Sequence, residues 1–415
     1  MTRTSPGPYK NRASPWYTDR VSTRVELRRD AGRHGPHDGP WIRRRQVGKI
    51  WGPADPAALA ALTDHRDQTL AWGLVAPDSE IPLRIIHFGS EPPPADWLTR
   101  RLDAALAARL PLFSLPLFSP PLASPETTAY REVNSEGDGL PGLTIDRYGD
   151  DRVVQVATAA MAARLPQLQE LLAPRTAGRI FLTAPAGAAE REHFTAPAHA
   201  HGDATLEFRE RGLLFRVPAP PAQKTGAYLD QQGNRRLLAE LARGTGGPLL
   251  DVGCHVGGFA LHAAALGVAA IGLDQSARVL AHAAANAAAN GLTERTRWVE
   301  ADMFGPLDDP ALAGPFGALV FDPPRVASSA RDVARATAAM TASLGRLLAR
   351  VQPGGFAAVC SCSHHLGRAE LDVAVLDAGG GAWTRVHALG PGPDHPVWPG
   401  HREGDYLRVN VYQRR

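Results

Sequence analysis

The stretch LLDVGCHVGGFALHAAALG, residues 249–267, gives the clearest indication of the fold of the C-terminal half of the chain. It begins as a short apolar run that ends near the carboxylate of Asp251. It then passes through Gly253, Gly257 and Gly258 and becomes an Ala-rich helical pattern. A strand, a glycine-rich turn and a helix in this order let the backbone approach a ligand closely, because glycine has no side chain. We therefore expect a ligand site at this turn.

Further apolar runs continue the pattern: AAIGLD, TRWVEAD, GALVFD and GGFAAVCSCS, each followed by a turn and most by a helical segment. Such strand and helix alternation predicts a parallel, doubly wound sheet with helices on both faces. The closing stretches TRVHALGPGPDHPVW and DYLRVNVYQRR are expected to form a final strand pair, with the second strand antiparallel at the sheet edge.

Two of these strands end in further acids. Asp274 follows Asp251 by 23 residues, where a carboxylate can accept both hydroxyls of a ribose. Asp302 stands beside Met303 and Phe304, a combination suited to the amino group and face of an adenine. The D-x-G-x-x-x-G spacing differs from the dinucleotide G-x-G-x-x-G pattern, so it favours S-adenosylmethionine, whose ammonium suits an acid such as Asp251.

The fourth strand ends with Asp322, Pro323, Pro324 and Arg325. The two prolines make a rigid, extended exit that holds one carboxylate at the edge of the pocket. In methyltransferases that act on nucleobase rings, such a loop binds the target base after it leaves its stack. The alternative is a strand that simply ends at prolines.

Composition limits the class of protein. A chain of 415 residues is too long for one ordinary core and suggests two or three domains. No apolar run approaches the roughly 20 residues of a membrane-spanning helix, so a cytoplasmic location is expected. Residues 1–50 carry 12 Lys and Arg against 4 Asp and Glu. Residues 1–39 are therefore expected to be a basic, disordered arm that binds nucleic acid or only aids solubility.

The stretch CSCSHH, residues 360–365, raises a separate question. Three cysteines cannot build a disulfide framework, and Cys-x-Cys followed by His364 and His365 lacks the spacing of a zinc site. Period-two geometry places Cys360 and Cys362 on one side of a strand. We expect Cys360 to be a small buried residue and Cys362 to stand where the strand opens toward a ligand.

Taken together, these stretches resemble a known family. VNSEGDGLPGLTIDRYGD, QKTGAYLDQQGNRR, DVGCHVGGFALHAAALG, FDPPR and SCS have the order and approximate spacing of the RlmI-like large-subunit ribosomal RNA methyltransferases, over about residues 41–412. The resemblance implies a PUA-like RNA-binding domain with a linker helix (40–110), a central α/β domain (111–217) and a Rossmann-like class I methyltransferase domain (218–415) with a mixed, mostly parallel seven-stranded sheet. Founding members of the family methylate cytosine at carbon 5.

The resemblance also implies site residues. Those expected to bind S-adenosylmethionine are Lys224, Thr225, Tyr228, Asp230, Gln231, Asp251, Gly253, Gly257, Asp274, Gln275, Asp302 and Met303. Those expected to bind the base are Pro323, Pro324 and Arg325. Ribosomal RNA is the implied partner, with no metal and with a homodimer as one form. The chain departs from the family pattern at Gln232, where arginine is usual, at Cys254, His255 and Val256, and in the segment 183–194.

Carbon 5 of cytosine is a weak nucleophile, and this predicts roles for two residues. A thiolate that adds to carbon 6 makes carbon 5 reactive. We assign the thiolate to Cys362 and expect Asp322 to hold the base. Three alternatives stay open: a methyltransferase for a guanine nitrogen, which needs no thiol, a zinc-binding RNA module, and an inactive RNA-binding assembly factor.

Overall fold

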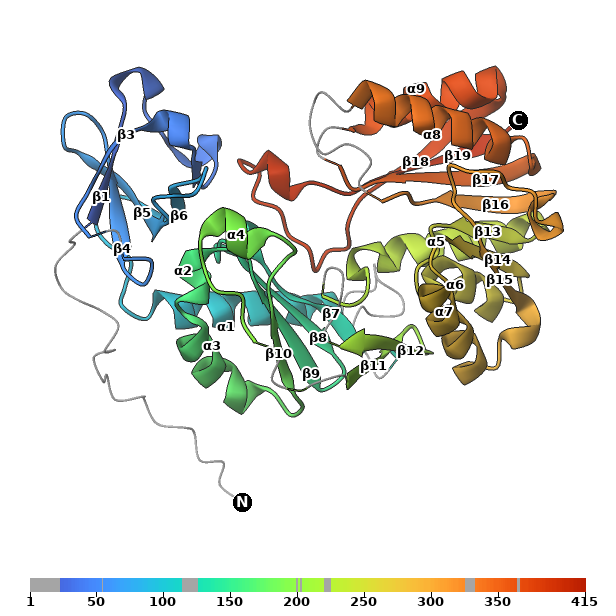
Figure 1. Ribbon diagram of the computed structural model, residues 1–415, viewed down its shortest axis with the longest axis horizontal. Coiled ribbons are helices and arrows are strands. Elements are labelled where there is room, and N and C mark those ends of the chain that lie inside the picture. The colour runs from blue at the N-terminus through green and yellow to red at the C-terminus, as the bar shows by residue number, and fades with distance from the viewer. Residues whose placement is uncertain are drawn as a thin grey trace.

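The computed structural model describes residues 23–53, 55–113, 126–198, 201, 204–219, 225–324, 333–363 and 366–415. In this part of the chain, three domains follow one another: an N-terminal β domain, a central α/β domain and a C-terminal α/β domain (Figure 1). Several expected features lie outside the described residues, namely residues 1–22 of the basic arm, Lys224, Arg325, His364 and His365.

The N-terminal domain is a six-stranded sheet with the order β2-β6-β5-β4-β1-β3 in the described residues. Its strands are β1 (Thr23–Leu27), β2 (Trp41–Ile42), β3 (Val47–Trp51), β4 (Leu59–Thr63), β5 (Thr69–Val75) and β6 (Leu83–Phe88). The sequence TRVEL buries Val25 and Leu27 in the core of this sheet. Because β1 pairs with both β3 and β4, the prediction of disorder up to residue 39 is wrong from Thr23 onward. The alternation of buried and partly buried residues in β1 is only five residues long, and arginines surround it in the sequence. The strand was therefore not recognisable from the sequence pattern.

Among the residues that the structure describes, the central domain is a four-stranded sheet with the order β10-β9-β8-β7. Its strands are β7 (Ala129–Asn134), β8 (Leu143–Tyr148), β9 (Asp151–Val156) and β10 (Ile180–Thr183). Its helices are α1 (Trp97–Arg109), α2 (Ala159–Ala162), α3 (Leu165–Leu172) and α4 (Ala188–Glu192). Leu98 and Leu102 of α1 share a core with Val133 and Leu143 of the sheet. The expected linker helix therefore forms part of the central domain's core.

A hairpin of β11 (Ala204–Glu210) and β12 (Leu213–Ala219) lies between the central and C-terminal domains. Phe208 and Phe215 of the hairpin share one hydrophobic cluster with Tyr148 of β8 and Leu261 of the C-terminal domain. The two domains are thus joined by a common apolar core.

The C-terminal domain is a seven-stranded sheet with the order β15-β14-β13-β16-β17-β19-β18 in the described residues. Its strands are β13 (Leu249–Val252), β14 (Ala270–Asp274), β15 (Thr296–Glu300), β16 (Phe316–Phe321), β17 (Val351–Ser361), β18 (Trp383–Leu389) and β19 (Arg408–Arg414). Its helices are α5 (Gln232–Thr245), α6 (Gly258–Ala265), α7 (Ala277–Ala289), α8 (Val333–Leu348) and α9 (Arg368–Gly379). The predicted Rossmann-like, mostly parallel sheet is confirmed.

Helices cover both faces of this sheet, α5 and α6 on one and α8 and α9 on the other (Figure 1). The last strand is antiparallel, as predicted, but it does not lie at the edge. β19 pairs with both β17 and β18, so β18 is the edge strand. The return of β19 into the sheet leaves the loop that precedes it, residues 390–407, projecting toward the other domains.

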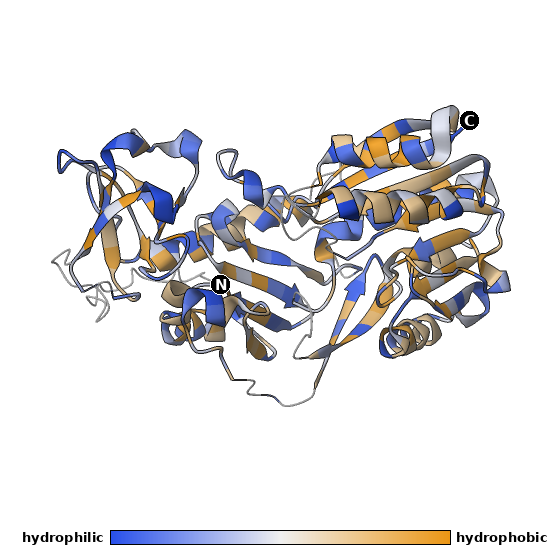
Figure 2. Cartoon of the chain, turned by 45° about the horizontal axis from the view of Figure 1, so that its top comes forward, coloured by the Kyte–Doolittle hydropathy of each residue, from blue (hydrophilic) through white to orange (hydrophobic). Residues whose placement is uncertain are grey.

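Hydropathy follows this layering. Figure 2 shows hydrophobic residues concentrated along the strands and hydrophilic residues on the outer turns, most visibly in the N-terminal domain. Within the described residues, every helix is too short or too polar to span a bilayer.

Candidate active site

A cavity of about 720 Å³ lies at the carboxyl ends of the central strands of the C-terminal sheet. Its two walls are named here for the roles that the sequence predicts for them, binding of a nucleoside and binding of the methyl acceptor. The nucleoside wall consists of Gly253, Cys254, His255, Val256, Gly258, Phe259, Asp274, Gln275, Ser276, Asp302, Met303 and Phe304. The acceptor wall consists of Tyr228, Asp230, Gln231, Asp322, Pro323, Pro324 and Cys362. Most of the predicted site residues therefore meet in one place.

The glycine-rich turn shapes the nucleoside wall. Gly253 has φ +83°, and a Cβ there would lie 2.3 Å from the carbonyl oxygen of Asp322. The peptide N–H groups of Gly253 and Cys254 both donate to the Leu273 carbonyl, at 2.8 and 3.0 Å. His255 has φ +50°, which is costly for a residue with a side chain. The backbone therefore passes close to the cavity, and only glycine fits at 253.

Asp274 ends β14 and lines the cavity. Its Oδ2 accepts the His255 N–H and its Oδ1 accepts the Ser276 N–H, both at 3.1 Å. These two bonds hold the carboxylate in one orientation and connect it to the glycine-rich turn. A carboxylate held in this way at a strand end can accept the two hydroxyls of a ribose.

Asp302 follows β15 and accepts the Phe304 N–H at 2.9 Å through Oδ1. Met303 is buried, and its carbonyl accepts the Ser343 hydroxyl at 2.5 Å, which anchors the turn to α8. Phe304 lies edge to face with Phe321, with ring centroids 6.4 Å apart. An acid and apolar side chains are thus placed together, as an adenine requires.

Asp251 and Gly257 do not line the cavity, although both were predicted to contact the cofactor. Asp251 is fully buried behind the turn, where its Oδ2 accepts the Ala260 N–H of α6 at 3.0 Å and its Oδ1 has no hydrogen-bond partner. Burial, more than any other cause, raises the pKa of Asp251 to about 7. Gly257 faces Trp298 of β15, whose ring would lie 2.7 Å from a Cβ. Both residues support the turn from behind.

The acceptor wall brings together residues from distant parts of the sequence. The mouth segment, residues 225–231 between β12 and α5, supplies Tyr228, Asp230 and Gln231. The Gln231 side chain donates through Nε2 to Asp322 Oδ2 at 3.3 Å. Burial, and then the charge of Asp322, raise the pKa of Tyr228, so this phenol stays neutral.

The two cysteines of β17 and its end differ as predicted. Cys360 is fully buried, and burial raises the pKa of its thiol well above the usual value. Cys362 is half-buried and lines the cavity beside Asp322. Of these two cysteines, therefore, Cys362 is the one that a substrate in the cavity can reach. No group of three or more potential metal ligands occurs in the described ranges, which leave out His364 and His365.

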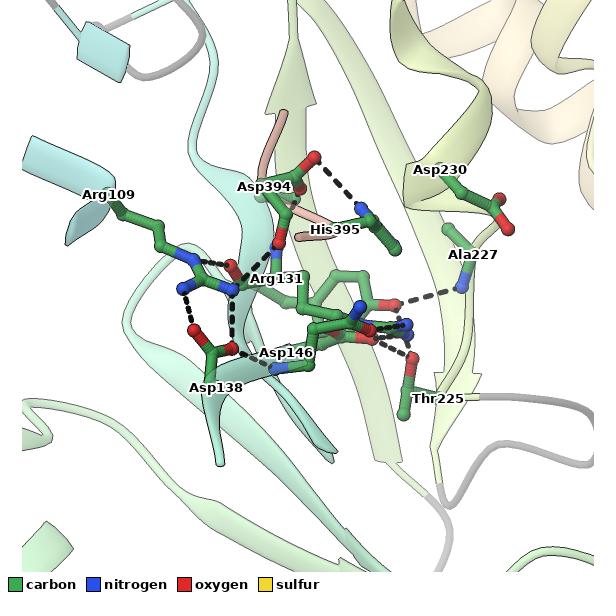
Figure 3. Close-up of polar contacts among 12 residues, drawn as sticks. Arg109, Arg131, Asp138, Asp146, Thr225, Ala227, Asp230, Asp394 and His395 are labelled. Carbon is green, nitrogen blue, oxygen red and sulfur yellow. Dashed lines mark hydrogen bonds and ion pairs between the residues drawn. The ribbon is translucent and has the colours of Figure 1, made fainter. Parts of the chain in front are cut away.

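Figure 3 shows a buried polar network that holds the mouth segment to the central domain. Thr225 donates its hydroxyl to Asp146, which also receives Nε and Nη2 of Arg131 at 2.8 and 2.9 Å. The Ala227 N–H donates to the Tyr148 hydroxyl at 3.0 Å. Thr225, predicted to contact the cofactor, does not line the cavity, because its side chain is turned to Asp146.

The loop of residues 390–407 touches all three domains. The Arg131 N–H of β7 donates to Asp394 Oδ2 at 2.9 Å (Figure 3). Trp398 packs edge to face with Phe88 of the N-terminal sheet, with ring centroids 5.6 Å apart. The loop therefore connects the N-terminal and central domains to the C-terminal sheet that carries it.

The same loop ends at the cavity. Tyr406 donates its hydroxyl to Asp230 Oδ2 at 2.5 Å, and Leu407 lines the cavity. Sequence reasoning missed both residues. Nothing in their spacing connects them to Asp230, which lies 176 residues earlier than Tyr406.

Arg235 is a second cavity residue that the sequence did not reveal. It is buried on α5, and its Nη1 donates to Glu210 of the hairpin at 2.6 Å. Its Nη2 donates to the Tyr228 carbonyl at 2.8 Å. Arg235 packs directly over Gly258, where a Cβ would lie 2.5 Å from Arg235 Nε. The signal that could have revealed it is an arginine one helical turn after the mouth segment, together with a glycine at 258 that leaves room for its side chain.

Comparisons with known proteins agree with this arrangement. The sequence matches two family models, a PUA-like domain over residues 25–88 and a methyltransferase domain over residues 249–344. A protein of Deinococcus radiodurans named ribosomal RNA large subunit methyltransferase is 34% identical, over 95% of this chain and 96% of its own length. A ribosomal RNA large subunit methyltransferase I of Shewanella denitrificans is 29% identical, over 94% and 98%.

Solved structures show the same fold over nearly the whole chain. SMU.776, described as a methyltransferase complexed with SAH, superimposes with a TM-score of 0.75 at 17% identity, covering 94% of this chain and 99% of that one. The order of the domains, the strand order of the C-terminal sheet and the extent of the sequence match lead to one conclusion. This chain belongs to the family of RlmI-like large-subunit ribosomal RNA methyltransferases, with a PUA-like domain and a class I methyltransferase domain that uses S-adenosylmethionine.

Proposed function

We propose that this protein methylates carbon 5 of a cytosine in large-subunit ribosomal RNA through a covalent adduct with Cys362. The observation that carries the proposal is the acceptor wall, where a half-buried thiol, a carboxylate and an amide face the nucleoside wall across one cavity. A nitrogen acceptor would need no thiol at this place. The coarser function, a methyltransferase of the large-subunit ribosomal RNA family, follows from the relatives.

The nucleoside wall fits S-adenosylmethionine. The close backbone approach at Gly253 admits a ligand without a side-chain barrier, and Asp274 is fixed by two peptide N–H groups in position for a ribose. Asp302, Met303 and Phe304 would hold the adenine. Asp251 would act on the cofactor's positive charge from behind the turn. When bound, S-adenosylmethionine supplies an electrophilic methyl group.

The acceptor wall would then prepare the base. The Cys362 thiolate would add to carbon 6 of cytosine, and the electron pair of the 5,6 double bond would move to carbon 5. Carbon 5 would then take the methyl group as the bond from that methyl to the sulfonium sulfur breaks and leaves a neutral thioether. A base removes the proton of carbon 5, the sulfur–carbon 6 bond breaks, and the double bond returns. Asp322 would hold the ring by accepting a hydrogen bond from its amino group, while Pro323 and Pro324 keep that carboxylate at the cavity edge.

Two measurements test the proposal. Modified cytosines in large-subunit ribosomal RNA are mapped in cells with and without the protein, and one 5-methylcytosine is expected to disappear. RNA that carries 5-fluorocytosine at that position should then form an adduct with the protein that survives denaturation, because fluorine cannot leave as the proton does. A lost guanine modification with no adduct would overturn the assignment and favour a nitrogen acceptor.

A further inference from the structure

Asn234 of α5 is a buried residue that does not line the cavity, yet it is bonded to a residue that does. It is 5% exposed. Its Nδ2 donates to the Gly390 carbonyl at 3.1 Å and to Gln231 Oε1 at 2.6 Å. Gln231 in turn donates through Nε2 to Asp322 Oδ2 at 3.3 Å. A chain of hydrogen bonds thus runs from a backbone carbonyl to the acceptor wall.

The Gly390 carbonyl determines which atom donates in each hydrogen bond of this series. A backbone carbonyl can only accept, so the atom of Asn234 that faces Gly390 must be the nitrogen. This nitrogen also faces Gln231, and the Gln231 atom opposite it must therefore be the oxygen. The nitrogen of Gln231 then has to point toward Asp322. One carbonyl in the loop before β19 thereby orients two amides in series.

We propose that Asn234 is a positioning residue that orients the Gln231 amide, so that Gln231 donates to Asp322 and keeps this carboxylate ionised as an acceptor for the amino group of the target base. The proposal rests on the proposed function, in which Asp322 holds the base. An ionised carboxylate accepts from the amino group of cytosine and repels the carbonyl oxygen that uracil has at the same position. Asn234 would thereby contribute to the choice of base without touching it.

Several titratable groups lie near Asp322 and affect whether its carboxylate stays ionised. Burial raises the pKa of Cys360, as it does that of Tyr228, and the charge of Asp322 adds to both effects, so the thiol and the phenol stay neutral. Asp251, whose pKa is about 7, adds a partial negative charge from β13. Cys362, which lines the same cavity, would be negative as a thiolate. A negative charge on Asp251 or Cys362 opposes the ionisation of Asp322, and the Gln231 N–H favours it.

A double-mutant cycle tests the proposal. The variants are Asn234→Leu, Gln231→Leu and both together, with Asn234→Ala in place of Asn234→Leu if leucine prevents folding. The first readout is the pH dependence of methyl transfer, whose acid limb should move upward by about one pH unit in either single variant, the value of one hydrogen bond to a carboxylate. Because Asn234 acts through Gln231, the double variant should match Gln231→Leu.

A second readout does not need turnover. Protein labelled with ¹³C in its aspartate side chains reports the ionisation of Asp322 by NMR, with Asp322→Asn identifying the signal. Its titration midpoint should rise in Asn234→Leu. If wild-type protein transferred no methyl group to cytosine, the proposed function would fail while this titration still decided the role of Asn234.

A matched control variant separates a positioning role of Asn234 from a general loss of stability. Asn290→Leu removes another amide that donates to two backbone carbonyls, those of Leu214 and Asn286, away from the acceptor wall. It should leave the Asp322 titration unchanged. The proposal is overturned if Asn234→Leu also leaves it unchanged, or if Asn234→Leu shifts it equally when Gln231 is already leucine.

Discussion

The two walls of the cavity are built in different ways. The nucleoside wall comes from consecutive strand ends and turns, and its main contacts are between neighbours such as Asp274 and Ser276. The acceptor wall is assembled from the mouth segment, the end of β16 and the end of β17, and Gln231 lies 91 residues from its partner Asp322. The first wall is a product of local backbone geometry, whereas the second depends on long-range packing.

Because the two walls depend on different contacts, we expect cofactor binding and methyl transfer to be separable by mutation. A change in the nucleoside wall should weaken cofactor binding first, and a change in the acceptor wall should stop transfer while the cofactor still binds.

The largest effect is expected from Cys362→Ala. Loss of the thiol removes the step that activates carbon 5, so methyl transfer should fall by about 10³-fold or more, as for other covalent catalysts. Affinity for S-adenosylmethionine, measured by calorimetry, should stay within about twofold. Cys360→Ala is the matched control, since that thiol is buried, and it should lower stability but retain transfer. Full turnover by Cys362→Ala would break the division.

Gly253→Ala should affect the other wall. The new Cβ would lie 2.3 Å from the Asp322 carbonyl oxygen at a φ of +83°, so the turn must move. We expect S-adenosylmethionine to bind about 100-fold more weakly, a loss of about 2.7 kcal/mol. Gly246→Ala has a similar positive φ with no atom within 4 Å of its Cβ, so it isolates the strain alone. Equal losses in both variants would show that close approach is unimportant.

Asp274→Asn and Asp322→Asn compare one carboxylate from each wall. Loss of the charge at Asp274 should weaken cofactor binding by about 10-fold, the value of a charge-assisted hydrogen bond. Asp322→Asn should leave that affinity nearly unchanged and reduce transfer to RNA. Calorimetry and single-turnover assays on both variants measure the two effects, and a reversed pattern would contradict the assignment of the walls.

The pH dependence of cofactor binding tests Asp251. Its pKa is about 7 in the free protein, and a cationic ligand favours its ionised form. Binding should therefore release a proton near pH 7, and affinity should rise by a few-fold between about pH 6 and 8. The free energy of unfolding changes with pH in the opposite direction. Folding raises the pKa of Asp251, so its contribution to stability is fully present below its ordinary pKa and is lost as pH rises through about 7. Calorimetry in two buffers should detect the released proton in wild type and not in Asp251→Asn.

The smallest effect is expected from Tyr406→Phe, which removes the hydroxyl that donates to Asp230. One lost hydrogen bond is worth about 1 kcal/mol, so KM should change by about fivefold at most. A change confined to kcat would instead place Tyr406 in the chemical step.

Local patterns explain which parts of the molecule were predictable. The strand-end acids Asp274 and Asp302 and the turn at Gly253 follow from a strand–turn–helix order, and the structure puts all three in the cavity wall. Asp251 was placed on the correct strand, but its side chain faces the interior. Sequence spacing shows where a residue lies along a strand and does not show whether a turn covers it.

Long-range features could not be predicted in this way. Thr225 adjoins true cavity residues in sequence, yet its hydroxyl is taken by Asp146 of another domain. Leu407 reaches the cavity wall, and Tyr406 reaches Asp230, from a loop without periodicity. The insertion of β19 between β17 and β18 depends on pairing energy along both of its edges, which a linear pattern does not reveal.

The loop of residues 390–407 also affects the order in which parts of the protein fold during its synthesis. A chain emerging from the ribosome folds its earlier domains first, but Tyr406 is added 176 residues after the Asp230 that it contacts. Until then the mouth segment lacks its contact with the Tyr406 hydroxyl, and the N-terminal domain lacks its contact through Trp398. A nascent chain can thus build its PUA-like fold early, while its cavity is completed only after Tyr406 and Leu407 have been added.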